Sequence, residues 1–131
     1  MVNYTRIEGG SRTITVGASA VDAYLRVKLG TDGKHVVCGL TEFGDAVTDQ
    51  PIAANDAGAA RFTNAPGHQQ GIASGAIASP GLNLYAAAGG KVSTTQGANA
   101  PLVGISEHAT LDGDVVTYIG TALTAVTVSG G

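Results

Sequence analysis

Charge is scarce in this chain. Asp, Glu, Lys and Arg make up 13% of its 131 residues, with a net charge of −3, whereas about 25% is typical of globular domains. The seven basic residues are scattered singly, and a nucleic-acid-binding surface needs them clustered. We therefore expect no nucleic-acid partner. So little charge also means that much of the surface is uncharged, covered by small polar groups or by other chains.

Aromatic residues, cysteine and long apolar runs are also sparse. The chain has no tryptophan, four tyrosines and two phenylalanines, too few for a surface that stacks on bases or sugars. Cys38 is the single cysteine and its apolar neighbours indicate a core position. No apolar run approaches the ~20 residues that span a bilayer, and the N-terminus lacks a signal-peptide layout. We expect a soluble protein, made in the cytoplasm, without a membrane partner.

The titratable residues form no recognisable chemical site. His35, His68 and His108 stand in different segments without the short spacing of metal ligands, although a His/Asp zinc site assembled in space is the open alternative. The Asp112-Gly113-Asp114 run lacks the closing glutamate of a twelve-residue calcium loop. Two acids flanking a glycine favour a hairpin turn instead.

Two glycine-rich segments imitate catalytic motifs without meeting their requirements. Residues 71–75 place serine beside the second glycine instead of between the two, as a nucleophile elbow requires. Residues 88–93 lack the first glycine of a phosphate-binding loop, and their serine stands one position too late. The sequence therefore predicts no catalytic residues, no cofactor and no metal, and we expect a protein that is not an enzyme.

The chain is rich in glycine and β-branched residues, and these recur in a pattern. Residues 25–63 and 82–119 share the order strand, glycine-lysine turn, strand, loop, strand, acidic-glycine turn, strand, about 56 residues apart. The glycine-lysine turns are Gly33-Lys34 and Gly90-Lys91. This repeat predicts an all-β fold, a small barrel or sandwich of about eight or nine short strands, built from two pseudo-repeated halves at about 23–63 and 82–119. Chance similarity between glycine- and valine-rich segments is the alternative.

Alternation of apolar and polar residues predicts which side chains are buried. Leu25, Val27 and Leu29 would face inward, because successive side chains of a strand point to opposite faces. By the same rule Arg26 and Lys28 would face solvent. The predicted core positions are Leu25, Val27, Leu84, Val103, Ile105 and Val116.

Composition also predicts the domain organisation. We expect an extended N-terminal arm over residues 1–19, a β domain over 20–120, and a C-terminal strand or tail over 121–131. The arm would be ordered only by a partner, with Tyr4 and Ile7 buried in a neighbouring chain and Arg6 facing a carboxylate. A disordered terminus is the alternative. The predicted capsid or subunit contacts are Tyr4, Arg6, Ile7 and Arg12. The sequence does not decide whether residues 51–60 are helical.

Several segments resemble the capsid cement (head decoration) proteins of tailed bacteriophages. They are residues 26–29, 36–39, 73–77, 84–95, 101–105 and 112–116, and the chain departs from the pattern at residues 42–49. The resemblance implies a domain, often trimeric, on the outer surface of the virion. Its partners would be the major capsid protein lattice and other copies of itself, as a homotrimer, and its role would be to stabilise contacts between capsid subunits. Another virion β protein, such as a head-fibre base or tail component, is the alternative, followed by a small binding domain or enzyme.

Overall fold

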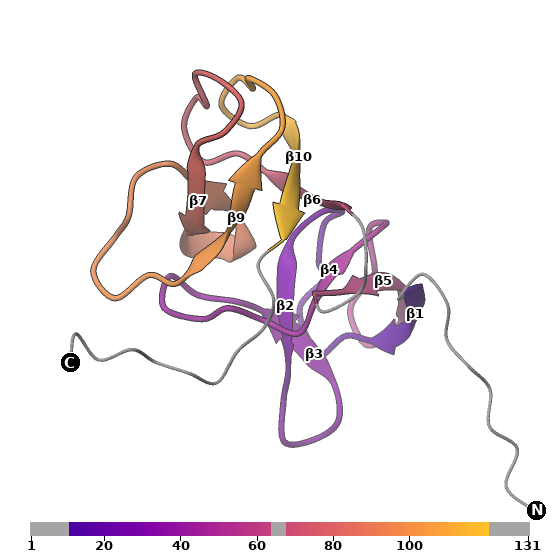
Figure 1. The fold of residues 1–131 in the computed structure, drawn as a ribbon. Coiled ribbons are helices and arrows are strands. Elements are labelled where there is room, and N and C mark those ends of the chain that lie inside the picture. The colour runs from indigo at the N-terminus through magenta and orange to yellow at the C-terminus, as the bar shows by residue number, and fades with distance from the viewer. Residues whose placement is uncertain (1–10, 64–67, 121–131) are drawn as a thin grey trace, which may run out of the picture.

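A computed structural model describes residues 11–63 and 68–120, which contain ten strands and one short 3₁₀ helix (Figure 1). The first half holds β1 (Ser11–Thr15), β2 (Arg26–Leu29), β3 (His35–Val37), β4 (Ala46–Thr48) and β5 (Ala57–Phe62). The second half holds β6 (His68–Ile72), β7 (Asn83–Ala86), η1 (Ala88–Gly90), β8 (Val92–Ser93), β9 (Leu102–Ser106) and β10 (Val115–Gly120).

The two halves have the same topology. Each forms one five-stranded antiparallel sheet, with order β1-β5-β4-β2-β3 in the first half and β6-β10-β9-β7-β8 in the second. When the strands of each half are numbered from one to five along the chain, both sheets have the strand order 1-5-4-2-3. The predicted all-β fold with two repeated halves is confirmed, with ten strands instead of eight or nine. The predicted bounds of the halves, 23–63 and 82–119, are too narrow, because each leaves out the first strand of its sheet, β1 or β6.

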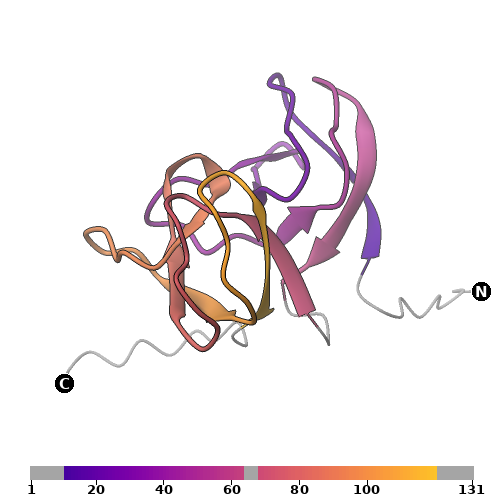
Figure 2. The ribbon, with the colours of Figure 1, turned by 90° about the horizontal axis from the view of Figure 1, so that it is seen from above.

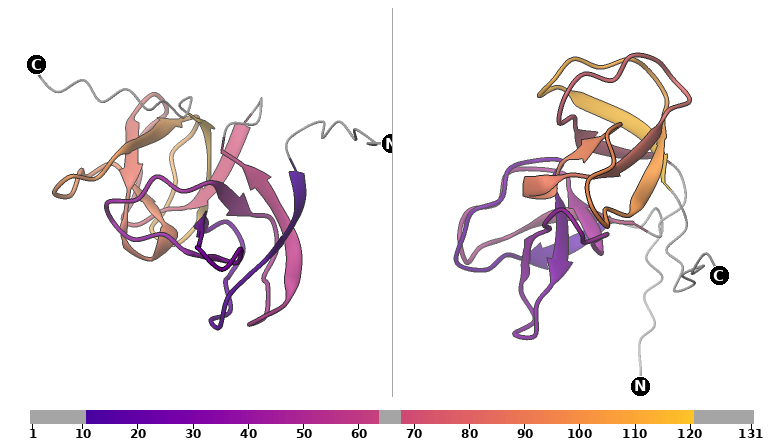
Figure 3. Two further views of the ribbon diagram at one scale, coloured as in Figure 1. Left: turned by 90° about the horizontal axis from the view of Figure 1, so that it is seen from below. Right: turned by 90° about the vertical axis from the view of Figure 1, so that its left-hand side faces the viewer.

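Each sheet curls until its two outer strands meet. An isolated parallel bridge joins Val16 to His35 in the first half and Ala73 to Val92 in the second, so each half is a barrel-like unit with its own interior. Figures 2 and 3 show these two units as lobes lying side by side. Each lobe has a separate core: Ile14, Val16, Val21, Val27, Ala46, Ile52 and Ala60 in one, and Ala73, Ile77, Leu84, Ala86, Val92, Val103, Val116 and Tyr118 in the other.

A buried hydroxyl makes the same bonds in both halves. The Thr48 hydroxyl donates to the Asp22 carbonyl (2.6 Å) and accepts from the Leu25 amide (3.2 Å). The Ser106 hydroxyl repeats this pair in the second half, at 2.9 and 3.1 Å. Such hydroxyls satisfy backbone groups that a curling sheet leaves without a ladder partner. The repeat therefore extends below the level of strands, to single hydrogen bonds.

Two expectations for β2 are wrong. Val27 is buried and Leu25 is partly buried, as predicted, but Leu29 is 56% exposed and Arg26 only 1% exposed. The alternation rule assumes that the outer face of a strand meets water. Here the outer face of β2 at Arg26 lies against the second half. Leu29, on the inward face at the other end of the strand, lines an open groove of the first half and is exposed there.

The prediction for Ile105 is also wrong. Leu84, Val103 and Val116 are buried as expected, but Ile105 is 39% exposed. The pairing of β7 with β9 shifts register between Leu84 and Tyr85, and a bulge interrupts the strict alternation of faces. Two successive β9 residues, Val103 and Gly104, are buried, and Ile105 is turned outward as a result.

The domain begins earlier than predicted. Strand β1 pairs with β5 along its whole length, and both Ile14 and Val16 belong to the first core, so residues 11–19 are part of the first half and not of an arm. Residues 1–10 and 121–131, with the arm and tail predicted there, lie outside the described residues. Residues 51–60 contain the bridge at Ile52 and the start of β5, and no helix. Among the described residues, no helix has the length and apolarity needed to cross a membrane.

We expect truncation of Leu84 and of Ile105 to differ sharply. Leu84→Ala removes a fully buried side chain and should lower the free energy of unfolding by about 2–5 kcal/mol. Ile105→Ala, at an exposed position of the same sheet, should change it by less than about 0.5 kcal/mol. Urea unfolding of the two variants checks this. Equal losses would show that Ile105 packs in the core after all.

Candidate binding surface

We call one end of each barrel-like half its mouth. At this end the first, third and fourth strands of the sheet begin, and the second and fifth strands end. The first mouth is lined by Arg12, Thr13, Ile14, Thr15, Leu29, Gly33, His35, Asp45, Phe62 and Thr63. The matching positions of the second half, taken from the shared topology and bridges, form the second mouth: Gln69, Gly71, Ala86, Gly90, Val92, Leu102 and Gly120. Among the described residues, only the second of these mouths is covered by another part of the chain.

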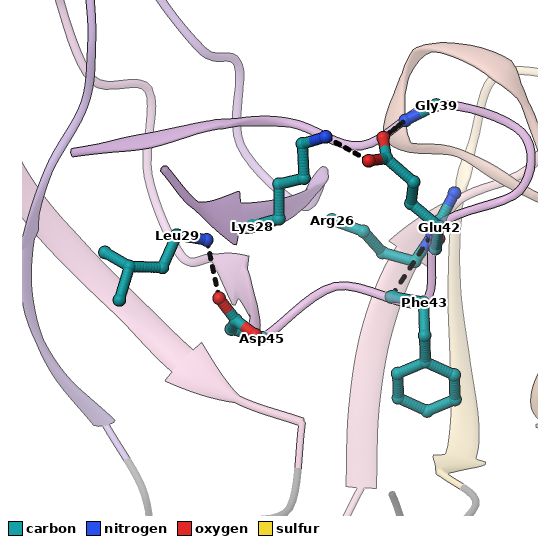
Figure 4. Close-up of polar contacts among 7 residues, drawn as sticks. All are labelled: Arg26, Lys28, Leu29, Gly39, Glu42, Phe43 and Asp45. Carbon is teal, nitrogen blue, oxygen red and sulfur yellow. Dashed lines mark hydrogen bonds and ion pairs between the residues drawn. The ribbon is translucent and has the colours of Figure 1, made fainter. Parts of the chain in front are cut away.

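Arg26 of the first half covers the second mouth. Its Nε donates to the Lys91 carbonyl (3.1 Å), and its Nη2 to the carbonyls of Lys91 (3.0 Å) and Ala87 (2.9 Å). Its Nη1 donates to the carbonyls of Glu42 and Phe43 in its own half, and Figure 4 shows these residues together. Five bonds match the five N–H donors of a guanidinium. The buried charge is therefore fully hydrogen-bonded, by carbonyl groups from both halves.

Packing completes the seal of the second mouth. A Cβ on Gly90 (φ +77°) would stand 2.9 Å from the Arg26 carbonyl oxygen, so the turn lies directly on β2. Phe43 packs against the second core. The Gln69 side-chain amide donates to the Phe62 carbonyl at 3.1 Å. Only about 10 Å³ of space remains there, which is at the limit for a single water.

The first mouth is an open groove of about 530 Å³. Gly33 has the same backbone conformation as Gly90, with φ +81°, and both turns are closed by a bond to the following lysine carbonyl, Gly30 N to Lys34 O at 2.8 Å in the first half. A Cβ on Gly33 would nevertheless meet nothing within 4 Å. The turn at Gly90 is thus buried against β2, whereas the matching turn at Gly33 has open space beside it.

The groove combines apolar surface with a few polar groups. His35 is 7% exposed, and its Nδ1 has no hydrogen-bond partner among the described residues. Burial lowers the pKa of His35, and Arg12 lowers it further, whereas Asp45 raises it. The Arg12 guanidinium lies 5.4 Å from the centre of the Phe62 ring, within cation–π range. The Asp45 carboxylate accepts the Leu29 amide (Figure 4).

An ion pair holds the loop that supplies Phe43. The Glu42 carboxylate accepts from the Lys28 ammonium and from the Gly39 amide, the latter at 2.7 Å. These bonds lower the pKa of Glu42, with Lys28 as the larger cause. Cys38, at the start of this loop, is buried, which raises the pKa of its thiol to about 11. It is therefore a protonated core residue at neutral pH, as predicted.

Of the predicted contact residues, Arg12 alone falls within the described ranges, and it lines the first mouth. Tyr4, Arg6 and Ile7 lie outside them. Sequence reasoning missed Arg26, because nothing in its strand distinguishes a buried arginine from a solvated one. Across residues 11–63 and 68–120, no group of three His, Cys, Asp or Glu side chains could hold a metal.

A second exposed feature is apolar. Ile105 and Ile119 are direct partners in the β9–β10 pairing and are 39% and 53% exposed. Val115, also exposed, lies on the same face of β10. Exposed isoleucines opposite one another on a sheet are typical of a surface that another chain covers.

The fold has a counterpart among solved structures. No family model matches the chain, and no curated protein sequence matches it. The crystal structure of the head fiber gp8.5 N base in bacteriophage phi29 is similar, with a TM-score of 0.67 and 21% sequence identity over 85% of this chain and 94% of that one. At this identity the likeness shows a shared fold, and it extends over nearly the whole of that base.

We expect Arg26 to control the coupling of the two halves. Arg26→Met should lower the free energy of unfolding by about 3 kcal/mol, because several buried carbonyl groups lose a charged donor, and should reduce the cooperativity of urea unfolding. Lys28→Met, which removes one partner of the partly exposed ion pair beside it, should cost much less, because solvent screens such a pair. Matching unfolding curves for the two variants would show that Arg26 does not join the halves.

His35 should make the fold sensitive to mild acid. Burial lowers its pKa in the folded state below the ordinary histidine value of 6.5, so the unfolded chain takes up a proton first as pH falls. Stability should be constant above about pH 6.5 and decline below it until the folded-state pKa is passed. His35→Val, which copies Val92 of the second half, should flatten the decline below about pH 6.5 in thermal melts. An unchanged pH profile in this variant would contradict the assignment.

Proposed function

We propose that this protein is a structural protein of a phage head, and that its two-barrel domain attaches to the outside of the shell as the base of a head fibre. The similarity of fold to the phi29 head fiber base, over 94% of that chain, carries this proposal.

The physical character of the domain supports attachment over chemistry. The halves are joined into one body by a buried, fully bonded arginine, which gives a rigid support. The surface has few charges and presents paired isoleucines on β9 and β10. Uncharged, apolar sheet surfaces suit contacts with another protein.

The sequence resemblance to cement proteins, which includes residues 73–77 and 84–95, favours a second candidate function. In that role the protein would also reinforce contacts between capsid subunits. The two functions share a location and differ in their effect on the shell. A base needs one site of attachment, whereas a cement protein must bridge several subunits and stabilise them.

We expect the purified full chain to bind expanded shells that lack it, and to bind unassembled capsid subunits much more weakly, because a site made by several subunits exists only on the lattice. Ile105→Ser combined with Ile119→Ser should weaken shell binding at least tenfold with little change in the melting temperature of the free protein. Leu111→Ser, at a 72% exposed turn position, is the matched control. Co-sedimentation with shells measures binding.

The melting temperature of the loaded shells separates the two functions. An unchanged value with tight binding supports a base, and a raised value supports cement. Absence of binding to shells, or equal binding to shells and subunits, would overturn attachment to the assembled head.

A further inference from the structure

Tyr24 holds a backbone conformation that tyrosine rarely adopts. Its φ is +63°, in the left-handed region, where a bulky side chain crowds its own backbone. The other non-glycine residues with a positive φ in the described part of the chain are Asn55 and Asn99, and asparagine tolerates this conformation. Tyr24 is therefore under a strain that these two residues avoid.

The repeat shows that the fold does not need a tyrosine at this position. The matching residue of the second half is Gly81, also left-handed, with φ +81°. The Tyr24 amide donates to the Thr48 carbonyl (2.7 Å), and the Gly81 amide donates to the Ser106 carbonyl (2.8 Å). Glycine takes a left-handed conformation without strain. The turn thus requires a left-handed residue, and the second half forms it without any side chain.

The described part of the chain offers Tyr24 little in return for this strain. The residue is half-buried, but it belongs to neither core, nor to the side chains that pack against the cores. No hydrogen bond joins its hydroxyl to another described residue. A strained residue without an internal reason indicates a function. We propose that Tyr24 is an anchor residue for a partner protein, and that the partner presents a lysine or arginine to it.

The charges around Tyr24 define the chemistry of this partner. Residues 16–25 and 49–57, joined by the bridge of Val21 to Ile52, form the end of the first half opposite its mouth. These two segments contain three exposed aspartates and no lysine or arginine. A cation of the partner would meet carboxylates there and would also find the face of an aromatic ring. Tyrosine is among the side chains that most often carry the binding energy of protein interfaces.

This inference rests on the proposed attachment to a phage head, in which the partner is the shell protein. Tyr24 would then supply a contact on the first half, in addition to the paired Ile105 and Ile119 on the second. Arg26 holds the halves together as one body. Two weak contacts on one body reinforce each other, because the first contact raises the effective concentration of the second.

Tyr24→Gly, which copies Gly81, tests the inference in the full-length chain with two measurements. The free variant should melt at or above the wild-type temperature, because relief of the strain offsets the loss of the half-buried ring. In co-sedimentation with expanded shells, the variant should bind at least tenfold more weakly than wild type. Loss of a residue that serves the fold would instead lower the melting temperature.

Two further variants control for strain and charge. Asn99→Gly makes the same backbone change at a left-handed position of the second half, and shell binding should not change. Asp22→Asn removes one exposed carboxylate beside Tyr24 in the sequence. It should weaken binding severalfold and reduce the salt dependence of binding, because one attraction to a basic surface is lost.

The outcomes separate this inference from the proposed function. A wild-type chain that does not bind shells would overturn both. If wild type binds, the inference alone is overturned when Tyr24→Gly binds as tightly as wild type, melts clearly below it, or loses no more binding than Asn99→Gly. A salt dependence that Asp22→Asn leaves unchanged would contradict a basic partner surface.

Discussion

The Arg26 guanidinium is the interaction on which the arrangement of this molecule depends. A charge removed from water is costly unless its hydrogen bonds are replaced, and here five bonds to backbone carbonyl groups replace them. Those carbonyl groups come from both halves. The hydrogen bonds that the Arg26 side chain needs therefore fix the position of one barrel relative to the other. Because the acceptors are backbone atoms of turns and loops, the joint also fixes the Gly89–Lys91 turn and the segment that carries Phe43.

This joint breaks the symmetry of an otherwise close repeat. The same topology, bridges and buried hydroxyls occur in both halves, but Arg26 corresponds to Asn83, and His35 to Val92. One mouth became part of the protein interior and the other remained a surface. In a repeated fold the differences between copies locate function better than the shared features, since the shared features are what the fold itself needs.

The sequence predicted the repeat, the two glycine-lysine turns and the buried Val27 and Leu84, because these depend on local patterns of strand and turn. It failed for Arg26, Leu29 and Ile105, because their exposure depends on what lies against a strand. Period-two alternation separates two faces but does not say which of them meets water. For β2 the outer face meets another barrel, and for β9 a register shift reverses the order of faces. The open groove could not be predicted either, since it is defined by the absence of a neighbour.

A domain with few charges can still bind strongly when it binds an array. A contact made by exposed residues such as Ile105 and Ile119 would be weak alone. In the proposed attachment to a phage head, each copy would meet its neighbours at a high effective concentration. The joint at Arg26 would also favour binding. Two barrels that moved independently would each lose translational and rotational entropy on docking, whereas a single rigid body loses it once.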